Sequence, residues 1–369
     1  MKILSALGVF WLGFMVIVFG FNCKGKTDLA VQANAVRITD NQFKDEDPAV
    51  IQSVIDDGYF YLAFYSNRNG KDEILMTRSF DGLVWEAPWV AVSNSNVNAY
   101  PQLAQGLDGT FYLTWFQIDP MTSAHHVWFA TSKDKGHTWI EQQRISDLHP
   151  NNNFNWLPSI LMDYKILSAP RLWITYTSGR LDFNKEVYVK YSDDFGKTWL
   201  PSEPIRITQN SLADEYAKLY QKKDSSYVIS WTRYDQDLGD FNGTSENIMR
   251  TSIDGVTWSA EKSITPPDLQ NQVIDMFPHH FSDIFKNVDF VAWMSDRYLP
   301  SGGILHGTLT TNGNISNIKN QTPTAINASR YSPQIITTTT VGVYLMVWVS
   351  KDDAPGSLPE IYSQLVSYP

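Results

Sequence analysis

Short runs in which apolar and polar residues alternate recur along most of the chain, and they are rich in aromatic and β-branched side chains. An alternation of period two predicts half-buried β-strands. The clearest runs are Tyr59–Tyr65, Thr110–Phe116, Leu172–Thr177, Tyr227–Thr232, Val288–Met294 and Gly342–Val349. A further strand is predicted to start just before each run, at Asp47-Pro48, Tyr100-Pro101, Leu157-Pro158, Tyr216-Ala217, Phe277-Pro278 and Ser332-Pro333. Proline is tolerated at the first residue of a strand, which fits these positions. The six repeats of a strand start followed by an alternating run indicate six repeated units.

A turn-forming motif, called the box below, follows the third predicted strand in four units. Two copies read S-x-D-x-G-x-T-W and two are one residue shorter; they begin at Ser79, Ser132, Ser192 and Ser252, spaced 53, 60 and 60 residues apart. The aspartate can accept backbone N–H groups, the glycine supplies a positive φ, and the tryptophan can cover the turn. A fixed period of this length is typical of propellers and solenoids, and the boxes are expected to be structural turns.

Four strands per unit in six units predict an all-β fold, a six-bladed β-propeller of four-stranded antiparallel blades. The sixth unit lacks a fourth strand, because the chain ends after Glu360–Val366. The segment Ala35–Thr39 copies the fourth-strand pattern of Pro204–Thr208. We therefore expect the N-terminal strand to close the last blade, which removes an exposed sheet edge.

The N-terminus predicts three regions: a signal or anchor over residues 1–23, a polar tether over 24–34 and the propeller over 35–369. Lys2 precedes the apolar stretch Ile3–Phe21, and the single cysteine, Cys23, follows it. This resembles a bacterial lipoprotein signal with Cys23 lipidated, although Phe21 and Asn22 are unusual before the cysteine. The alternative is an uncleaved anchor, because about 19 apolar residues can span a bilayer. Both readings place the propeller in the bacterial cell envelope, on the periplasmic side or at the cell surface.

The net charge of −10 and the lack of a basic stripe argue against nucleic acid as a partner. No cofactor is expected. The acidic segment Tyr234–Asp240 lacks the full spacing of a calcium loop, so no metal site is predicted either.

The four boxes resemble the Asp box (BNR repeat) of the sialidase, or neuraminidase, superfamily. The resemblance implies a glycan or glycoconjugate as ligand and glycosidase activity of the exo-sialidase type. Sialidases use a tyrosine nucleophile, a glutamate that activates it, an aspartate acid/base and arginines that bind the sugar carboxylate. By this resemblance Tyr331 is the nucleophile, Glu215 its partner and Asp72 the acid/base, whereas Arg68 and Arg233 bind substrate, with Arg297 and Arg330 as further candidates.

Two departures oppose an unchanged sialidase site. The family's first arginine should lie where this chain has Asp45-Glu46-Asp47-Pro48, and a second arginine is absent around Asp275–Pro278. Each charged hydrogen bond contributes roughly 1.5–3 kcal/mol, so losing two weakens binding of a carboxylate by about 3–6 kcal/mol. Arginines that end second strands and glutamates that begin third strands also recur, which favours structural Arg–Glu pairs within blades.

Two hypotheses follow. The first is an exo-glycosidase, acting on sialic acid or on a neutral or differently charged sugar. The second is a non-catalytic propeller that binds glycan or protein through a face rich in aromatic residues, among them Trp156, Tyr100, Tyr234 and Tyr298.

Overall fold

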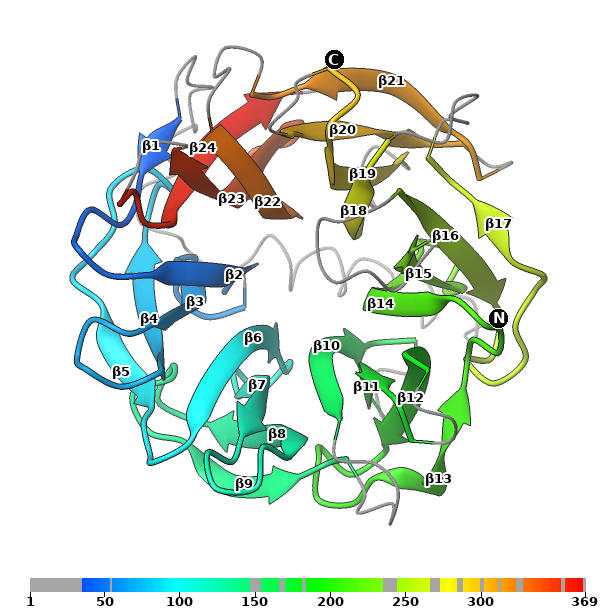
Figure 1. The fold of residues 1–369 in the computed structure, drawn as a ribbon, viewed down its shortest axis with the longest axis horizontal. Coiled ribbons are helices and arrows are strands. Elements are labelled where there is room, and N and C mark those ends of the chain that lie inside the picture. Colours follow the sequence, from blue (N-terminus) through cyan, green and yellow to red (C-terminus); the bar gives the residue numbers. More distant parts are fainter. Residues whose placement is uncertain are drawn as a thin grey trace, which may run out of the picture.

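The computed structural model describes residues 35–53, 55–146, 154–165, 170–180, 184–234, 244–265, 273–283, 288–298, 302–310, 313–322, 328–352 and 356–367. These residues form six antiparallel sheets of four strands each, arranged as a ring around a central axis (Figure 1). The predicted six-bladed β-propeller is confirmed.

The blades follow one another in chain order. Blade one contains β2 (Asp45–Gln52), β3 (Phe60–Ser66), β4 (Glu73–Ser79) and β5 (Trp89–Val92). Blade two contains β6 (Val97–Gln105), β7 (Phe111–Ile118), β8 (His125–Ser132) and β9 (Ile140–Arg144). Blade three contains β10 (Asn155–Asp163), β11 (Arg171–Ser178), β12 (Glu186–Ser192) and β13 (Leu200–Arg206). Blade four contains β14 (Ala213–Gln221), β15 (Tyr227–Tyr234), β16 (Ser245–Ser252) and β17 (Lys262–Ser263). Blade five contains β18 (Asp275–Asp283), β19 (Val288–Ser295), β20 (Gly303–Leu309) and β21 (Ile315–Asn320). Blade six contains β22 (Ala328–Thr337), β23 (Val343–Asp352), β24 (Glu360–Ser367) and β1 (Val36–Arg37).

The N-terminal strand closes the ring as expected. Strand β1 pairs antiparallel with β24, with Val36 opposite Ser363 and Arg37 opposite Tyr362, and the two strands lie side by side in Figure 1. Beyond β1, the backbone N–H of Ile361 donates to the Thr39 hydroxyl at 2.9 Å. The closing strand therefore gives the outer edge of β24 its hydrogen-bond partners.

The boxes form the predicted turns between the third and fourth strands. In the second box, the Ser132 hydroxyl accepts the N–H of Gly136 at 2.8 Å, and Asp134 accepts the N–H of Thr138 at 2.8 Å. Gly136 has φ of 85°, and a Cβ there would lie 2.5 Å from the sulfur of Met76. In the fourth box, the N–H groups of Thr257 and Val256 hold the pKa of the Asp254 carboxyl down to about 2. The boxes thus use their polar groups within the turn.

Apolar side chains pack between neighbouring blades. The largest fully buried side chains include Trp115, Trp173, Trp231 and Trp293, which come from four different blades. Burying a large apolar side chain stabilises a fold by about 1.5–3 kcal/mol, so these four tryptophans contribute strongly to the packing between blades.

Each inner strand has a β-bulge at the same place. In β2, for example, the register shifts between Glu46 and Ala49. The second bulged residue is left-handed in all six blades, with φ between 49° and 58°: Asp47, Tyr100, Leu157, Tyr216, Phe277 and Ser332. The residue before it is Glu46, Ala99, Trp156, Glu215, Met276 or Tyr331. Such backbone strain often marks a functional site, but its sixfold repetition makes it a feature of this fold.

The prolines were expected at the first residue of the inner strands, and that detail is wrong. Pro48 is the fourth residue of β2 and follows the left-handed residue of the bulge. The free edge of each inner strand faces the axis, so a missing N–H at the bulge breaks no ladder hydrogen bond.

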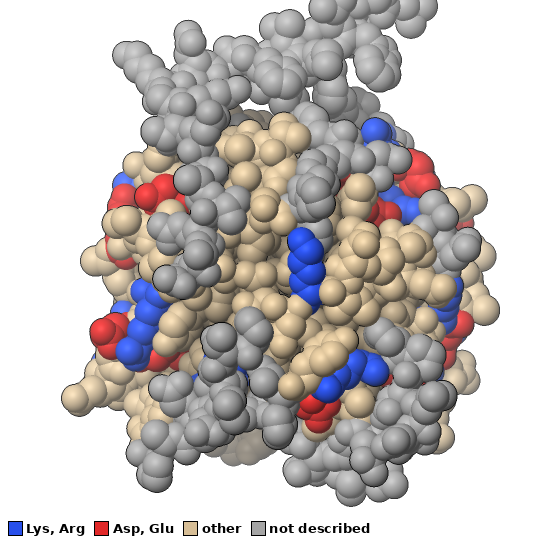
Figure 2. Space-filling model, turned by 90° about the horizontal axis from the view of Figure 1, so that it is seen from above, with Lys and Arg blue, Asp and Glu red and all other residues tan. Residues whose placement is uncertain are grey.

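The predicted signal or anchor over residues 1–23, with Cys23, and the tether over 24–34 lie outside the described residues. Within the described ranges, the chain forms no helix of the length and hydropathy needed to cross a bilayer. Figure 2 shows the ring edge-on; on its coloured part, acidic and basic side chains are scattered among uncharged ones.

Candidate functional site

The inner ends of blades six and one meet at a tyrosine–carboxylate pair. The Tyr331 hydroxyl, at the bulge of β22, donates a 2.7 Å hydrogen bond to Glu46 Oε1, at the bulge of β2. Burial and the negative charges of Glu46 and Asp47 raise the pKa of Tyr331 well above its usual value. At rest, therefore, the phenol is neutral and its hydrogen bond points at a base.

A second tyrosine–carboxylate pair lies beside the first. The Tyr65 hydroxyl, on β3, donates to Asp72 Oδ1 at 2.5 Å. Burial raises the pKa of Tyr65, and so do the charges of Asp72, Glu46 and Asp47. Because these carboxylates act on one phenol, the structure brings Asp72 into the neighbourhood of Tyr331 and Glu46.

Asp47 adds a carboxyl that titrates near neutrality. Burial and the charge of Glu46 raise its pKa to about 7, whereas a backbone hydrogen bond from Tyr100 and the charge of Lys218 oppose the rise. A buried carboxyl whose pKa lies near neutrality can both donate and accept a proton, as general acid–base catalysis requires.

Beyond Asp47 along the axis, side chains fill the centre of the ring. Lys218 is 7% exposed, and its Nζ donates to Gln102 Oε1 at 2.5 Å and lies 5.1 Å from the centre of the Tyr100 ring. Burial lowers the pKa of Lys218 to about 7. The cavity enclosed here by Asp47, Lys218 and their neighbours measures only about 10 Å³, room for about one water molecule.

Aromatic rings narrow the axis at the level of the bulges. The ring centres of Tyr216 and Phe277 are 4.3 Å apart, those of Tyr100 and Tyr216 are 6.0 Å apart, and those of Phe277 and Tyr331 are 6.4 Å apart. The accessible part of the axis is therefore its outer end, where Glu46 and Tyr331 are partly exposed.

Glu215 occupies the bulge position of blade four that Glu46 occupies in blade one. It is 2% exposed, and Lys185 Nζ lies 3.2 Å from its Oε1. The same Lys185 nitrogen lies 5.5 Å from the centre of the Trp156 ring. Burial and the charges of Asp47 and Glu215 raise the pKa of Tyr100, so Glu215 lies within electrostatic range of Tyr100.

Three of the four candidate arginines form ion pairs inside their own blades. Arg68 Nη2 lies 2.7 Å from Asp45, and Arg297 Nη2 lies 2.6 Å from Asp275. Arg233 binds Asp214 through two nitrogens at 2.8 and 2.9 Å, and Glu261 at 2.6 Å.

The recurring arginines do form ion pairs within their blades, but with other partners than expected. Arg68, Arg233 and Arg297 bind chiefly aspartates at the start of the inner strands, whereas the third-strand glutamates Glu186 and Glu360 bind Arg206 and Arg37. Arg330, next to Tyr331, is 8% exposed. Much of the hydrogen-bonding capacity of these guanidinium groups is thus used in the fold.

Sequence reasoning did not identify Glu46 as the partner of Tyr331. The two residues are 285 positions apart and become neighbours only because the ring closes. The repeated bulge position could have pointed to Glu46, because Glu46 and Glu215 are the two glutamates at that position.

The site's chemistry is that of hydroxyl and carboxyl groups. In the part of the chain that the structure describes, no group of three or more His, Cys, Asp or Glu side chains is arranged to hold a metal ion. The acidic segment after Tyr234, residues 235–240, lies outside the described ranges. The described residues supply the Tyr331 hydroxyl, hydrogen-bonded to the Glu46 carboxylate, with the carboxyl groups of Asp47 and Asp72 nearby.

The sequence matches no family model and no curated protein. Solved structures do match. A protein of unknown function from Dyadobacter fermentans is 16% identical with a TM-score of 0.72, and the match covers 92% of this chain and 99% of that one. The GH93 α-L-arabinofuranosidase of Fusarium graminearum, solved with arabinobiose, is 14% identical with a TM-score of 0.64, covering 90% and 96% of the two chains. A leech intramolecular trans-sialidase, solved with 2,7-anhydro-Neu5Ac, is 12% identical with a TM-score of 0.63, covering 90% and 70%. The chain thus shares its six-bladed β-propeller fold with sialidases and arabinofuranosidases.

Proposed function

We propose that this propeller recognises a glycan at the outer end of its axis and hydrolyses a terminal sugar there. The observation that carries the proposal is the 2.7 Å hydrogen bond from Tyr331 to Glu46, with Asp47 and Asp72 beside it. The fold shared with an arabinofuranosidase and a trans-sialidase supports it.

The proposed reaction has two steps. Tyr331 Oη attacks the anomeric carbon while its proton passes to Glu46, the glycosidic bond breaks, and Asp72 protonates the leaving oxygen. Water then attacks the same carbon, giving its proton to Asp72, and the Tyr331 oxygen leaves and regains its proton from Glu46. Glu46 thus takes the role that the resemblance assigned to Glu215, because Glu215 is buried and paired with Lys185.

A neutral terminal sugar suits this site better than a sialic acid. Glu46 and Asp47 lie at the outer axis, Glu215 is paired with Lys185, and three of the candidate arginines already pair with carboxylates. The negative charges of Glu46 and Asp47 repel a substrate carboxylate, because like charges at short range destabilise each other.

The test is turnover of an aryl α-L-arabinofuranoside and of a fluorogenic sialoside by the wild-type chain. Tyr331→Phe and Glu46→Gln should lower kcat at least about 100-fold, the effect typical of lost nucleophilic or acid–base groups. Tyr59→Phe, on the box face, is the matched control and should keep full activity. Full activity in Tyr331→Phe would contradict the proposal, and a preference for the sialoside would contradict its neutral-sugar part.

The second candidate is a propeller that binds glycan without hydrolysis. It is favoured by the cavity of about 10 Å³ at the axis, which leaves little room for a buried sugar ring. Absence of turnover, together with glycan binding that survives Tyr331→Phe, would support this candidate.

We also propose that the chain is held at a bacterial membrane, through a lipid on Cys23 or through an uncleaved anchor formed by Ile3–Phe21. Metabolic labelling with an alkyne fatty acid separates the two. Label that disappears in Cys23→Ser supports the lipid, whereas membrane retention without label supports the anchor. A chain found in the soluble fraction without label would contradict both.

A further inference from the structure

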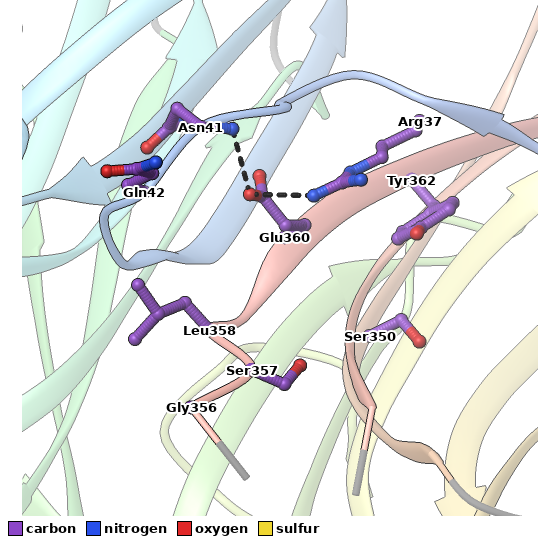
Figure 3. Close-up of a pocket in the computed structure, with 9 residues that line it drawn as sticks. All are labelled: Arg37, Asn41, Gln42, Ser350, Gly356, Ser357, Leu358, Glu360 and Tyr362. Carbon is purple, nitrogen blue, oxygen red and sulfur yellow. Dashed lines mark hydrogen bonds and ion pairs between the residues drawn. The ribbon is translucent and has the colours of Figure 1, made fainter. Parts of the chain in front are cut away.

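A second hollow lies on blade six, away from the axis. It measures about 500 Å³, within the range of small-molecule sites, and is lined by Arg37, Asn41, Gln42, Ser350, Glu360 and Tyr362, among others (Figure 3). Ser350 and Glu360 form the last register pair between β23 and β24. Because Tyr331 pairs with Val349 and Val349 with Ile361, the hollow lies outward from the axial site along the same blade.

The floor of this hollow is a motif that occurs twice in the chain. Arg37-Ile38-Thr39-Asp40-Asn41 and Arg206-Ile207-Thr208-Gln209-Asn210 share the pattern R-I-T-x-N. In blade six, Glu360 Oε1 accepts from Arg37 Nη2 at 3.0 Å and from the N–H of Asn41 at 3.1 Å.

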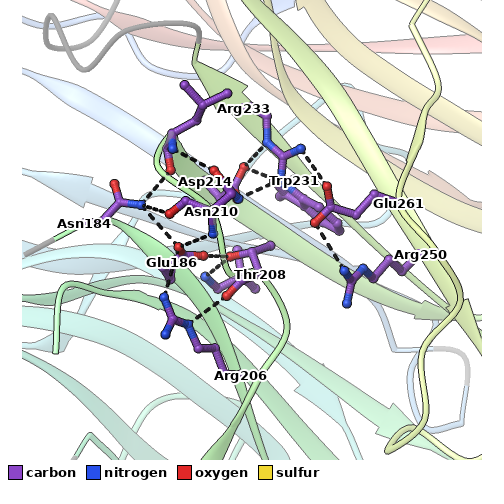
Figure 4. A network of polar contacts seen from close by, with 12 residues as sticks. Asn184, Glu186, Arg206, Thr208, Asn210, Asp214, Trp231, Arg233, Arg250 and Glu261 are labelled. Carbon is purple, nitrogen blue, oxygen red and sulfur yellow. Dashed lines mark hydrogen bonds and ion pairs between the residues drawn. The ribbon is translucent and has the colours of Figure 1, made fainter. Parts of the chain in front are cut away.

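The blade-three copy has the same contacts. Glu186 Oε1 accepts from Arg206 Nη2 at 3.1 Å and from the N–H of Asn210 at 3.0 Å (Figure 4). The ring pair behind the motif is also repeated: Tyr188 stacks on Tyr176 and Tyr362 stacks on Trp348, each with centres 6.1 Å apart.

Side chains of the same blade fill the hollow in blade three. Asn184 Nδ2 donates to Glu186 Oε1 at 3.2 Å and to the carbonyl oxygens of Asn210 and Leu212 at 2.7 and 3.0 Å. Arg180 is 4% exposed; its guanidinium lies 5.7 Å from the centre of the Tyr188 ring and pairs with Glu203.

Blade six lacks both groups. Leu358 stands two residues before Glu360, where blade three has Asn184, and Asp352 stands two residues after Ser350, where blade three has Arg180. Position 358 therefore has no amide to offer Glu360, and position 352 is an aspartate in place of an arginine. Glu360 Oε2 is buried without a hydrogen-bond partner among the described residues, whereas both oxygens of Glu186 are bonded.

We propose that the blade-six hollow is a second binding site, which takes a neutral saccharide unit in the space that Asn184 and Arg180 fill in blade three. Sugar hydroxyls can replace the missing amide donors, bonding to the Glu360 carboxylate, the Asn41 and Gln42 amides and the Ser350 hydroxyl. The C–H face of a sugar ring can cover Tyr362, since an aromatic ring supplies a broad apolar surface with a polar tip.

The charge of the lining points to a neutral ligand. Among the described residues of the lining, the Glu360 carboxylate is matched by Arg37 at 3.0 Å, and Arg37 also pairs with Asp40 at 3.1 Å. A carboxylate ligand would therefore meet an arginine that two carboxylates already pair, and an ammonium ligand would meet a glutamate that an arginine already pairs. The site does not require catalysis at the axis, so this inference goes beyond the proposed function.

The experiment uses the full chain in a detergent without a sugar headgroup, because Ile3–Phe21 is strongly apolar. Tyr331→Phe is the background, so that no sugar is hydrolysed at the axis. Arabinobiose and lactose are titrated as neutral probes, sialyllactose as an anionic probe and argininamide as a cationic probe, by calorimetry and saturation-transfer NMR.

Two variants address the hollow: Leu358→Asn, which installs the filling amide of blade three, and Tyr362→Ala, which removes the aromatic wall. Each should raise the Kd of the neutral probes at least tenfold. Leu107→Asn is the matched control, because Leu107 is exposed on the box face, and it should leave the Kd unchanged. Melting curves show whether each variant is folded; Leu358→Asn introduces a contact that blade three already holds and should melt like the background.

Three results would overturn the proposal: no neutral probe binds up to about 50 mM, a neutral probe binds equally well to both hollow variants, or argininamide or sialyllactose binds in place of the neutral probes. Loss of turnover in Tyr331→Phe is measured separately, so the axial function and this site can each fail alone.

Discussion

The seam between blades three and four and the seam between blades six and one are built from the same parts. In each, an R-I-T-x-N segment leaves one blade and its asparagine binds the first aspartate of the next: Asn210 Nδ2 lies 2.6 Å from Asp214, and Asn41 Nδ2 lies 2.5 Å from Asp45. In blade three, the strand before this segment follows its neighbouring strands in the sequence. In blade six, that strand is the N-terminal β1, which pairs with the C-terminal β24. The first seam is packed with its own side chains, and the second keeps a hollow of about 500 Å³.

The difference shows how a repeated fold acquires a site. The backbone, the glutamate and the stacked rings are kept in both seams, so the scaffold stays the same. Replacing the filling residues then leaves a polar hollow where the other seam has a packed network. Because protein interiors hold few empty voids, a hollow of this kind is expected to take up water or a ligand.

The largest contrast is expected between the two glutamates. Glu186→Ala should destabilise the fold by about 3–5 kcal/mol, because it leaves Arg206, only 20% exposed in its side chain, without its buried partner. Glu360→Ala should cost about 1–3 kcal/mol, because Arg37 is 42% exposed and can be solvated. Denaturant unfolding of both variants measures the difference, and equal costs would mean that the two seams are energetically alike.

A smaller contrast is expected between the two aspartates. Asp214 accepts from Trp231 Nε1 and from two nitrogens of Arg233. Asp45 binds Arg68 through Oδ2, and its Oδ1 is buried without a partner among the described residues. Asp214→Asn should therefore cost about 2–3 kcal/mol and Asp45→Asn about 1–2 kcal/mol, measured as free energies of unfolding. A larger loss in Asp45→Asn would reverse the ranking of the seams.

The inner ends of blades one and four should differ in pH dependence. Asp47 binds its proton more tightly in the folded state, with a pKa of about 7 against an ordinary 3.8, so its contribution to stability falls as pH rises from about 4 to 7. Lys218 binds its proton less tightly when folded, with a pKa of about 7 against 10.5, so its contribution rises from pH 7 to about 10.

Melting temperatures measured across this range test both directions. Asp47→Asn should reduce the change in melting temperature with pH between about 4 and 7, and Lys218→Met should reduce it between about 7 and 10. Lys133→Met, an exposed lysine on the box face, should leave the profile unchanged. A profile that Lys218→Met does not alter would show that this amine is solvated.

The smallest effect on stability is expected from Leu358→Asn. The new amide should bond Glu360 as Asn184 bonds Glu186, and a net hydrogen bond contributes about 0.5–1.5 kcal/mol, partly offset by lost burial of Leu358. The matched variant Asn184→Leu should destabilise blade three by more, since it removes three hydrogen bonds from a filled network. Thermal unfolding of the pair checks the ranking; a clear loss of stability in Leu358→Asn would show that the hollow cannot accept an amide.

Local patterns predicted the architecture because the same turn and strand chemistry recurs in every unit. The box at Ser132 and the closing segment Ala35–Thr39 could be recognised from their residues, since their hydrogen bonds are made within a turn or to one neighbouring strand. The candidate site was predicted less well. The resemblance pointed to Tyr331 and gave it Glu215 as partner, but the hydroxyl of Tyr331 is bonded to Glu46, which the sequence did not single out for that role.

The sequence alone determined the repeat, the number of blades and the strand that closes the ring, because period-two alternation, prolines and boxes act over a few residues. The tertiary structure decided which carboxylate receives the Tyr331 proton, which arginines are used by aspartates, and which copy of the R-I-T-x-N motif is left open. Each of these depends on side chains from different strands or blades meeting in space, and a linear pattern carries no measure of that distance.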